Sequence, residues 1–289
     1  MKHALVTGSA GFVGRYLVPK LEAAGYQVLG VDPRHISQDA KRISANFENY
    51  LHDHSETRFD IVVHLAANIP DVHERIHAGH IAYSDILLDY AMADYVAHHP
   101  PREAFVWPTS CAVDYPDDPY AWVKLTGERV FGALKKIPLK VLRPFSGYGG
   151  DQALSYPFPA ILNRAIRRED PLTVWGSGTQ VRDFVHIDDL TDAFLRAIDH
   201  FPPHTPIEIG TGVGTDFLTL ARMMADAVGY HPEVKALSDK AESSRRRVAN
   251  PAAAEACGFK PKVTLSEGIR RALGAKSSAP KEIVTALRG

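Results

Sequence analysis

The sequence predicts an α/β fold, in which a doubly wound parallel sheet is followed by a smaller C-terminal α/β domain. Two observations lead to this prediction. Short apolar runs alternate with longer stretches at helical spacing through the first half of the chain, and the first apolar run is followed by a glycine-rich turn. Strands that alternate with helices form parallel sheets, because each helix carries the chain back to the edge where the next strand begins.

The first 32 residues contain the clearest of these units. Residues 4–6 predict a short strand, and an amphipathic helix that begins at Phe12 follows it. Residues 28–31 predict a second strand, which ends in Asp32. A strand, a glycine-rich turn, a helix and a strand ending in an acid form the dinucleotide site of a Rossmann sheet.

Three glycines make this turn suitable for contact with phosphates. Gly8 allows the tight turn out of the strand, Gly11 lets backbone N–H groups approach a pyrophosphate, and Gly14 lets the helix lie close on the sheet. The N-terminus of the helix then faces the phosphates with its partial positive charge. Asp32 can accept hydrogen bonds from both hydroxyls of an adenosine ribose and would repel a 2′-phosphate, which favours NAD over NADP. Arg34 can soften that preference.

Further strands and helices continue the alternation. The predicted strands are residues 59–65, 103–107 and 139–144, and the predicted helices are residues 82–96 and 120–135. The first of these helices is marked by apolar residues at helical spacing, namely Ile86, Leu87, Tyr90 and Ala91. The later elements are a helix at about 160–168, a strand and turn at 174–178, a helix at 188–200, a strand at 206–210 and a helix at 218–228.

These elements predict two domains. An NAD-binding Rossmann domain takes residues 1–147 and about 184–210. A substrate-binding domain takes about 148–183 and 211–275, and residues 276–289 form a tail. A chain of this length accommodates two modest domains of this kind.

Composition excludes several classes of protein. The 289 residues carry a formal net charge of −1, which gives no general attraction to nucleic acid or to an anionic membrane. No apolar run approaches the roughly 20 residues of a membrane span, and the N-terminal strand argues against a cleaved signal. Cys111 and Cys257 do not make a disulfide framework, and the 14 histidines show no metal-ligand spacing. We expect a soluble, cytoplasmic protein without a metal.

A candidate catalytic pair begins the helix at 120–135. Tyr120 and Lys124 are four residues apart, so a helix brings them to one face, a turn apart. The pKa of free tyrosine is about 10, but a nearby ammonium and the positive ring of an oxidised nicotinamide favour the phenolate. Lowering this pKa to about 7 takes roughly 4 kcal/mol, which two cations in a partly dry site can supply. Lys124 can also hold the nicotinamide ribose, and the Ser110 hydroxyl can hold a substrate oxygen beside Tyr120.

These motifs together resemble the extended short-chain dehydrogenase/reductase family, in its NAD-dependent epimerase/dehydratase group. The resemblance covers nearly the whole chain. It rests on TGSAGFVG with Asp32, HLAA at 64–67, Thr109-Ser110 ahead of Tyr120 and Lys124, LRP at 142–144, and VWGSGTQVRDFVHIDDL. The resemblance implies that Ser110, Tyr120 and Lys124 are the catalytic triad. It also implies NAD as cofactor, a nucleoside-diphosphate sugar as substrate, and a homodimer that pairs the helices at 82–96 and 120–135.

The same resemblance implies two sets of binding residues. The cofactor set is Gly8, Gly11, Phe12, Val13, Gly14, Asp32, Pro33, Arg34, Asn46, Phe47, Leu65, Ala66, Ala67, Tyr120, Lys124 and Pro144. The substrate set is Ser110, Cys111, Ser146, Arg182 and Arg245. Within the substrate set, the diphosphate is expected to be held by the arginines, whose guanidinium groups match phosphate oxygens.

The substrate side departs from the family pattern. Family dehydratases carry an Asp-Glu pair directly after the Ser/Thr, whereas Cys111-Ala112 follows Ser110 here, which argues against dehydration. Cys111 is either a small buried residue or a participant in proton transfer. Ser146 replaces an asparagine that touches substrate in many relatives. The arginine cluster at 245–247 is either a second contact to the diphosphate or a solvated charged run.

The chain is therefore predicted to be an NAD-dependent nucleotide-sugar epimerase. Tyr120 would remove a proton from a sugar hydroxyl while hydride passes to NAD⁺, and the keto sugar would take the hydride back on its other face. Two alternatives stay open. One is an NAD(P)-dependent keto-sugar reductase or dehydrogenase of the same fold, which does not return its hydride. The other is a cofactor-binding regulatory protein without turnover, against which the intact catalytic set argues.

Overall fold

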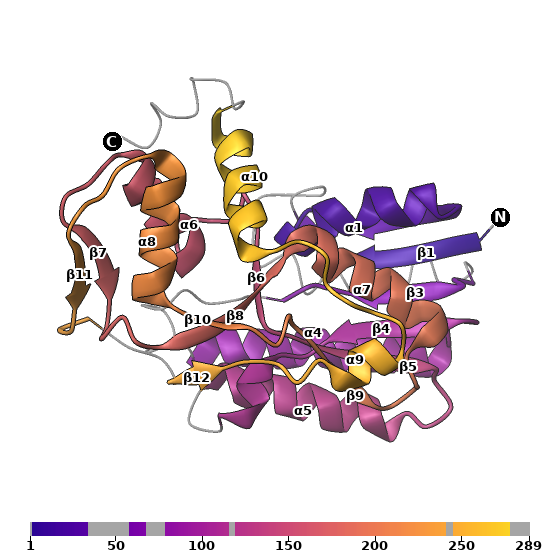
Figure 1. The fold of residues 1–289 in the computed structure, drawn as a ribbon. Coiled ribbons are helices and arrows are strands. Elements are labelled where there is room, and N and C mark those ends of the chain that lie inside the picture. Colours follow the sequence, from indigo (N-terminus) through magenta and orange to yellow (C-terminus); the bar gives the residue numbers. More distant parts are fainter. Residues whose placement is uncertain (1, 34–57, 68–78, 116–118, 241–244, 278–289) are drawn as a thin grey trace.

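A computed structural model describes residues 2–33, 58–67, 79–115, 119–240 and 245–277 (Figure 1). Its largest sheet has six strands in the order β2-β1-β3-β4-β5-β9, and all neighbouring pairs are parallel. The strands are β1 (Lys2–Thr7), β2 (Tyr26–Val31), β3 (Ile61–His64), β4 (Ala104–Pro108), β5 (Leu139–Pro144) and β9 (Pro206–Ile209). The predicted parallel α/β sheet is confirmed.

Helices cover both faces of this sheet (Figure 1). They are α1 (Phe12–Ala23) and α7 (Ile187–His200) on one face, and α4 (Gly79–His98) and α5 (Pro119–Ala133) on the other. Neighbouring residues of a strand point to opposite faces, so Ala4 and Val6 pack with α1 and α7 while Leu5 packs with α4 and α5. Burial on both faces explains why the strands are continuous apolar runs.

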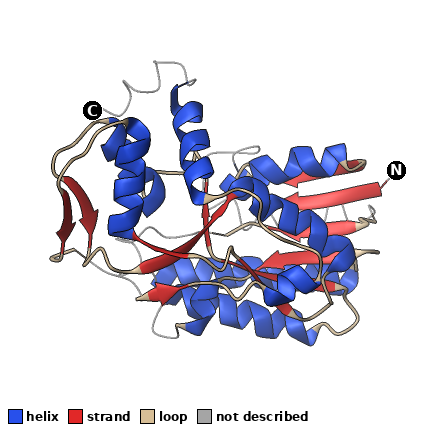
Figure 2. Cartoon of the chain, in the orientation of Figure 1, coloured by secondary structure: helices blue, strands red, loops and turns tan. Residues whose placement is uncertain are grey.

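Most of the remaining second half of the chain, apart from α7 and β9 on the large sheet, gathers toward one end of the molecule (Figure 2). A four-stranded sheet contains β6 (Ser146–Tyr148), β8 (Val181–His186), β10 (Gly214–Asp216) and β12 (Arg246–Arg247), with β8 at its centre. A separate parallel pair contains β7 (Leu172–Trp175) and β11 (Val234–Leu237). The helices there are α6 (Pro157–Ile166), α8 (Phe217–Val228) and α10 (Leu265–Ser277), whereas α9 (Ala252–Ala256) packs beside β9 of the large sheet. Residues of α6, α8 and α10 share one apolar core.

The helices and main strands lie close to their predicted positions, and the differences are local. Strand β8 was not predicted, because Arg182, Asp183 and His186 interrupt its apolar pattern although all three are buried. The predicted tail at 276–289 begins inside α10, which continues to Ser277, and its remainder lies outside the described residues. The division of the chain into two domains stays a prediction.

Helix α4 buries a different face from the one predicted from Ile86, Leu87 and Tyr90. Ile86, Leu87 and Tyr90 are exposed, whereas Asp85 and Asp89 are buried against the rest of the molecule. Charged residues on an inner helix face need compensation by opposite charge or hydrogen bonds. Asp85 and Asp89 therefore need a nearby cation or hydrogen-bond donors.

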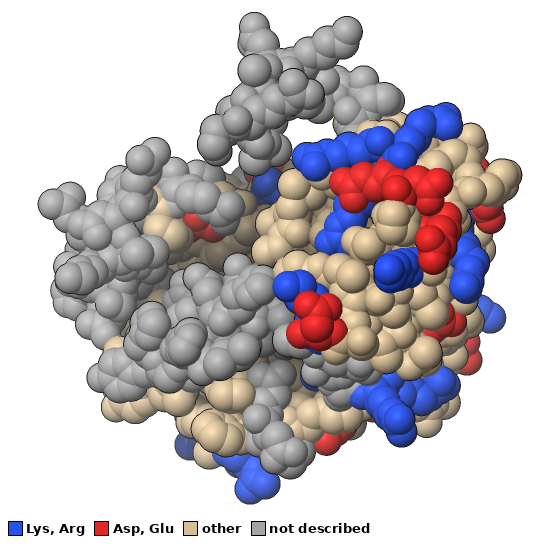
Figure 3. Space-filling model, turned by 90° about the vertical axis from the view of Figure 1, so that its left-hand side faces the viewer, with Lys and Arg blue, Asp and Glu red and all other residues tan. Residues whose placement is uncertain are grey.

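No helix in the described ranges is both long enough and apolar enough to cross a membrane. Lysine, arginine and acidic side chains are interspersed on the face shown in Figure 3, where the described residues form no broad area of one sign. This distribution agrees with the net charge of −1.

Candidate active site

The turn between β1 and α1 is one that only glycine can form. Gly8 has a φ of +68°, and a Cβ there would lie 2.7 Å from the carbonyl carbon of Leu65. A Cβ at Gly14 would lie 2.6 Å from the backbone oxygen of Ser9. The backbone after β3 and the start of α1 thus both lie in close contact with this turn. Such close backbone approach is what a pyrophosphate site requires.

The first N–H groups of α1 face the same turn. Gly11 precedes the helix and has no side chain to cap it, and its own N–H donates to the carbonyl oxygen of Gly8 at 2.9 Å. The N–H groups of Phe12, Val13 and Gly14 have no acceptor within the helix. These three, rather than that of Gly11, are the donors that fit a phosphate.

Asp32 is fixed beside this turn at the carboxyl end of β2. Its side chain is 2% exposed, and Oδ2 accepts a hydrogen bond from the N–H of Ala10 at 3.0 Å. Pro33 follows it and is half-buried. The carboxylate thus has the position predicted for the acid that meets a ribose. The predicted Arg34, Asn46 and Phe47 lie outside the described residues.

The segment after β3 completes the cofactor side. Thr7 accepts two hydrogen bonds from this segment. Its carbonyl oxygen accepts from the N–H of Leu65 at 3.0 Å, and its Oγ1 accepts from the N–H of Ala66 at 3.2 Å. Thr7 Oγ1 also lies 2.7 Å from Nδ1 of the buried His64. Leu65, Ala66 and the adjoining Ala67 therefore lie next to Gly8, as parallel strands that end at one edge require.

The predicted catalytic residues come from β4 and α5. Ser110 follows β4, and its Oγ accepts from the N–H of Ala112 at 3.1 Å, capping the short 3-10 helix η2 (Cys111–Asp114). Helix α5 packs against η2. Tyr120 and Lys124 lie in the first turns of α5, with Lys124 Nζ 5.9 Å from the centroid of the Tyr120 ring. The structure thus brings these residues to one region, and their roles stay predictions.

Lys124 is 4% exposed, and its charge is compensated from α4. Burial by itself lowers the pKa of Lys124, but the fields of Tyr120, Asp89 and Asp85 outweigh it and raise that pKa above its usual value. Sequence reasoning missed both acids. The signal was available, since two acids four residues apart lie on one face of a largely apolar helix.

On the substrate side, two arginines meet near Cys111. Burial raises the pKa of the Cys111 thiol, while Arg247, Arg182 and a hydrogen bond with Ser110 act in the opposite direction. Arg182 of β8 and Arg247 of β12 are directly paired in the parallel register. The Arg182 guanidinium lies 5.8 Å from the centroid of the Phe217 ring. The Arg247 guanidinium lies 4.8 Å from the centroid of the Tyr115 ring. Two cations beside Ser110 and Cys111 suit an anionic substrate.

The arginine chosen from the sequence is not the one that the strand register aligns with Arg182. Arg245 is exposed and precedes β12, and its carbonyl oxygen accepts from the N–H of Val181 at 2.8 Å. The register of β12 aligns Arg247, not Arg245, with Arg182. This register could not be deduced from three consecutive arginines.

The other two predicted residues lie at strand ends nearby. Pro144 ends β5 and is paired with Ile209, and Ser146 begins β6, where it is paired with Phe184 of β8. Both are half-buried. Ser146 is thus on the strand next to the one that carries Arg182.

Asp183 holds the strand that carries Arg182. It is fully buried and accepts hydrogen bonds from Thr211, Gly212 and Ala249 at 2.6 to 3.2 Å. These donors lie on two segments that flank β8. Sequence reasoning assigned no role to this acid, because an acid that satisfies backbone N–H groups leaves no pattern along the chain.

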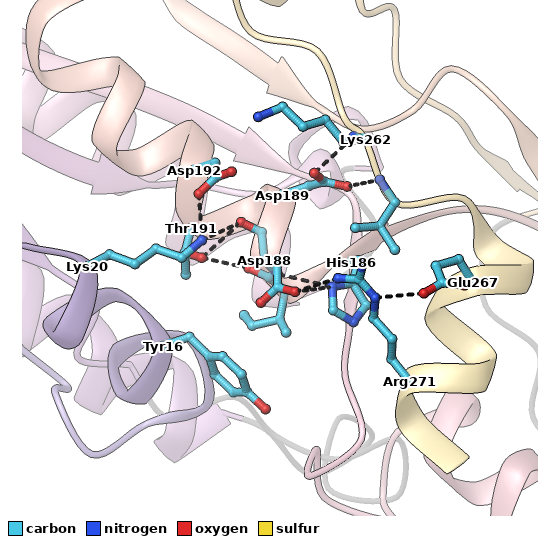
Figure 4. A network of polar contacts seen from close by, with 12 residues as sticks. Tyr16, Lys20, His186, Asp188, Asp189, Thr191, Asp192, Lys262, Glu267 and Arg271 are labelled. Atoms are coloured by element: carbon cyan, nitrogen blue, oxygen red, sulfur yellow. Dashed lines mark hydrogen bonds and ion pairs between the residues drawn. The ribbon is translucent and has the colours of Figure 1, made fainter. Parts of the chain in front are cut away.

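A polar network ties α1 to α7 and α10 (Figure 4). Lys20 of α1 donates to the carbonyl oxygen of Asp188 at 2.8 Å and pairs with Asp192. The side chain of Asp188 pairs with Arg271 of α10 at 3.0 Å and lies 3.3 Å from His186. The helix that follows the glycine turn is therefore fixed relative to the second half of the chain.

No group of three or more His, Cys, Asp or Glu in the described part of the chain is arranged to hold a metal ion. The polar groups that remain around the glycine turn are instead backbone N–H donors and one carboxylate. This donor set fits a pyrophosphate with an attached ribose, as in a dinucleotide. The residues present therefore fit NAD.

Comparison with known proteins gives the same result. The family model described as NAD dependent epimerase/dehydratase family matches residues 4–210. A UDP-glucose 4-epimerase from Mycolicibacterium smegmatis is 27% identical over 307 residues of alignment, which cover 92% of this chain and 96% of that protein.

Two solved structures share the fold. The UDP-glucose 4-epimerase of Thermotoga maritima, with UDP-glucose, has a TM-score of 0.83 at 24% identity, and the alignment covers 96% of this chain and 99% of that one. The UDP-glucose 4-epimerase of Thermus thermophilus, in complex with NAD, has a TM-score of 0.82 at 23% identity, with 96% and 100% covered. Since the family match extends over most of the sequence, the chain belongs to the NAD-dependent epimerase/dehydratase family of enzymes, with NAD as its cofactor.

Proposed function

We propose that this protein interconverts nucleotide sugars as an epimerase, through a transient keto sugar. The observation that carries the proposal is the placement of Tyr120 and Lys124 at the start of α5, next to the Ser110 segment and the two arginines. This arrangement offers a base, a cation that activates it, a hydroxyl donor and a site for an anionic group. The similar protein from M. smegmatis is named a UDP-glucose 4-epimerase, which makes UDP-sugars the first substrates to test.

Each residue of the site would have one task. The Tyr120 phenolate would accept the proton of a sugar hydroxyl, and Lys124 would stabilise that phenolate. Ser110 would donate a hydrogen bond to the oxygen that becomes a carbonyl. NAD⁺, when bound, would supply the hydride chemistry that this reaction needs. Tyr120 would then give its proton back to the oxygen of the inverted sugar.

Arg182 and Arg247 would hold the diphosphate. Both belong to neighbouring strands, so they present two guanidinium groups in a fixed relation. Tyr115 supports this placement, because its hydroxyl donates to the carbonyl oxygen of Arg246 while its ring lies against Arg247. A held diphosphate and a free sugar would let the keto sugar turn over without leaving the site.

A keto-sugar reductase is the second candidate, and Cys111 favours it. This thiol follows Ser110 directly and lies within the field of both arginines. A thiol in that place can exchange a proton with a carbon next to the keto group. A reductase would consume one reduced cofactor for each sugar, whereas an epimerase would consume none.

The protein is proposed to act as a homodimer. Ile86, Leu87 and Tyr90 of α4 and Trp122 of α5 are exposed, although large apolar side chains rarely gather on a monomer surface without a partner. Helices α4 and α5 pack side by side, so these residues belong to neighbouring helices. Light scattering after size exclusion tests this: the natural protein should have twice the mass of the chain, and Tyr90→Glu should halve it.

Cofactor balance is the experiment that tests the function. The purified protein is incubated with NAD⁺ and a panel of UDP-, dTDP-, GDP- and CDP-sugars, and both NADH absorbance and sugar identity are followed. A changed sugar without net NADH supports the epimerase. Net NADH supports the second candidate, and an unchanged panel with measurable NAD binding would contradict both.

The Tyr120→Phe variant then tests the mechanism. It removes the phenol hydroxyl and keeps the ring, so turnover should fall by about 1,000-fold or more while NAD affinity stays within about threefold. Thr126→Ala, an exposed change two turns further along α5, is the matched control. Turnover that survives in Tyr120→Phe means that another group is the base.

A further inference from the structure

A cluster of charged side chains is buried behind the predicted catalytic pair. Lys124 of α5, Asp85 and Asp89 of α4 and His64 of β3 are each at most 5% exposed. They come from three elements that meet on the face of the large sheet covered by α4 and α5. Ionisable groups are rarely buried without a specific arrangement of partners, and such clusters often serve a functional site.

Asp89 is the residue that joins the members of this cluster. Its Oδ1 lies 3.3 Å from Nε2 of His64 and accepts a hydrogen bond from Nε1 of Trp107 at 3.3 Å. The Trp107 ring in turn lies below Lys124, with Nζ 5.4 Å from its centroid. One carboxylate oxygen therefore contacts the imidazole and holds the aromatic surface on which the ammonium rests.

The cluster is continuous with the cofactor side of the site. His64 Nδ1 lies 2.7 Å from Thr7 Oγ1, and that oxygen accepts the N–H of Ala66. Contacts thus run from Lys124 through Trp107, Asp89, His64 and Thr7 to the segment that lies against Gly8. Asp89 is therefore contacted from the Lys124 side, through Trp107, and from the Thr7 side, through His64.

Close packing of α5 keeps the acids near the lysine. A Cβ at Gly127, which is three residues after Lys124, would lie 2.5 Å from Cζ2 of Trp107 and 2.8 Å from Oδ2 of Asp89. Only glycine lets α5 come this close. This close packing of α5 on α4 places Lys124 in the electrostatic field of the Asp85 and Asp89 carboxylates.

The charges that face Lys124 are few and of known sign. Within the described ranges they are Tyr120 from its own helix and Asp85 and Asp89 from α4, while His64 from β3 faces Asp89. Removing one carboxylate has two consequences. The ammonium form of Lys124 becomes less favourable, and the phenolate of Tyr120 loses a repelling negative charge.

We propose that Asp89 is a positioning residue of the reaction, which places its carboxylate charge behind Lys124 and Tyr120 and thereby sets the pH range in which Tyr120 acts as a base. The inference rests on the proposed roles of Tyr120 and Lys124. Asp89 itself does not meet the sugar. Asp85 adds to the same field from one turn earlier on α4.

Asp89→Asn tests the proposal with the least disturbance. Asparagine keeps an oxygen that accepts from Trp107 and removes the charge. Both limbs of the pH profile of kcat should move to lower pH by about one unit, because the phenolate forms more easily and Lys124 loses its proton sooner. Asp94→Asn is the matched control, since Asp94 is an exposed acid on the same helix and should leave the profile unchanged.

A direct measurement separates this inference from the proposed function. The phenolate absorbance of Tyr120 is followed against pH in the NAD complex, as the difference between the protein and its Tyr120→Phe variant, with and without Asp89→Asn. The titration should move to lower pH by about one unit in the Asp89→Asn background. This readout needs no sugar, so it stands whether or not the panel reveals a substrate.

Two results would overturn the inference. One is a rate that falls equally at every pH, with an unmoved Tyr120 titration, which is the behaviour of a merely structural residue. The other is a shift of either curve to higher pH. If Asp89→Asn does not fold, Asp85→Asn replaces it, with the same direction and a smaller shift expected and with the same two results counting against the inference.

Discussion

The turn after β1 and the strand that carries Arg182 are held in opposite ways. At the turn, backbone atoms approach so closely that Gly8 and Gly14 leave no room for a Cβ. In β8, the backbone is ordinary and the side chain of Asp183 gathers hydrogen bonds from its surroundings. A site held by backbone contact requires glycines at fixed spacing, which the sequence displays. A site held by a buried side chain requires an acid that looks like any other.

Among substitutions that test this comparison, the largest loss of stability and binding is expected at the glycine turn. In Gly14→Ala, the new Cβ would collide with the backbone of Ser9, which cannot move without shifting Gly8. We expect the free energy of unfolding to fall by about 3 kcal/mol and NAD binding to be lost. Urea unfolding and calorimetric titration with NAD measure the two effects.

Gly132→Ala is the matched control for this variant. Gly132 lies in α5 with no atom within 4 Å of its added Cβ, so alanine should be neutral or stabilising by up to about 1 kcal/mol. If Gly14→Ala bound NAD as tightly as Gly132→Ala does, close backbone approach would not be what makes the cofactor site.

A smaller effect is expected where the side chain of Asp183 holds the strand. Asp183→Asn replaces one acceptor oxygen by an NH₂ group that faces N–H donors of Thr211, Gly212 or Ala249. The free energy of unfolding should fall by about 2 kcal/mol, and the KM for the sugar nucleotide should rise while NAD affinity is kept. Denaturant unfolding and steady-state kinetics check this, with the exposed Asp226→Asn as control. Equal loss of NAD and sugar affinity would show that the two regions are not separable.

This contrast also explains what the sequence could predict. The βαβ unit, the order of alternating elements and the Tyr120–Lys124 spacing follow from local periodicity, and they appear in the structure where expected. Arg182 was identified from a resemblance, not from its neighbours in the chain. Local pattern is enough where the backbone alone makes the site.

The misses share one physical cause, which is contact between residues distant in sequence. Asp89 compensates a lysine on a different helix, and only the packing of α4 on α5 reveals which helix face is inner. The predicted Arg245 is not the arginine aligned with Arg182, because the pairing of β12 with β8 aligns Arg247 instead. Neither a helix face nor a strand register is decided by the residues of one element.

The register can be tested by comparing two arginines of the cluster. Arg247→Ala should raise the KM for the sugar nucleotide about tenfold, because the guanidinium paired with Arg182 would be lost from the proposed diphosphate site. Arg245→Ala should change KM by less than about twofold, as expected for an exposed side chain. Steady-state kinetics with a substrate from the panel measures both. The reverse ranking would restore the prediction made from the sequence.

The smallest effect is expected at the cap of α8, which is also held by a side chain but at the surface. Asp216 accepts from the N–H and the Oγ1 of Thr219 at 2.8 and 2.7 Å. Partial burial by itself would raise the pKa of Asp216, but these hydrogen bonds outweigh it and lower that pKa. Because the folded pKa lies below the unfolded one, the stabilisation is present above the unfolded pKa of about 3.9 and is lost as pH falls through the folded pKa.

Asp216→Ala should therefore lower the free energy of unfolding by about 1 kcal/mol near neutral pH, and its deficit should shrink below about pH 4. Asp216→Asn keeps an acceptor for the N–H of Thr219 and cannot ionise, so it should lose less at neutral pH. Urea unfolding of the three proteins across this pH range measures the difference. A deficit of Asp216→Ala that stays constant down to about pH 3 would mean that the hydrogen bond, and not the charge, carries this cap. Asp183 and Asp216 would then both stabilise the fold through hydrogen bonds, and only the burial of Asp183 would distinguish the two acids.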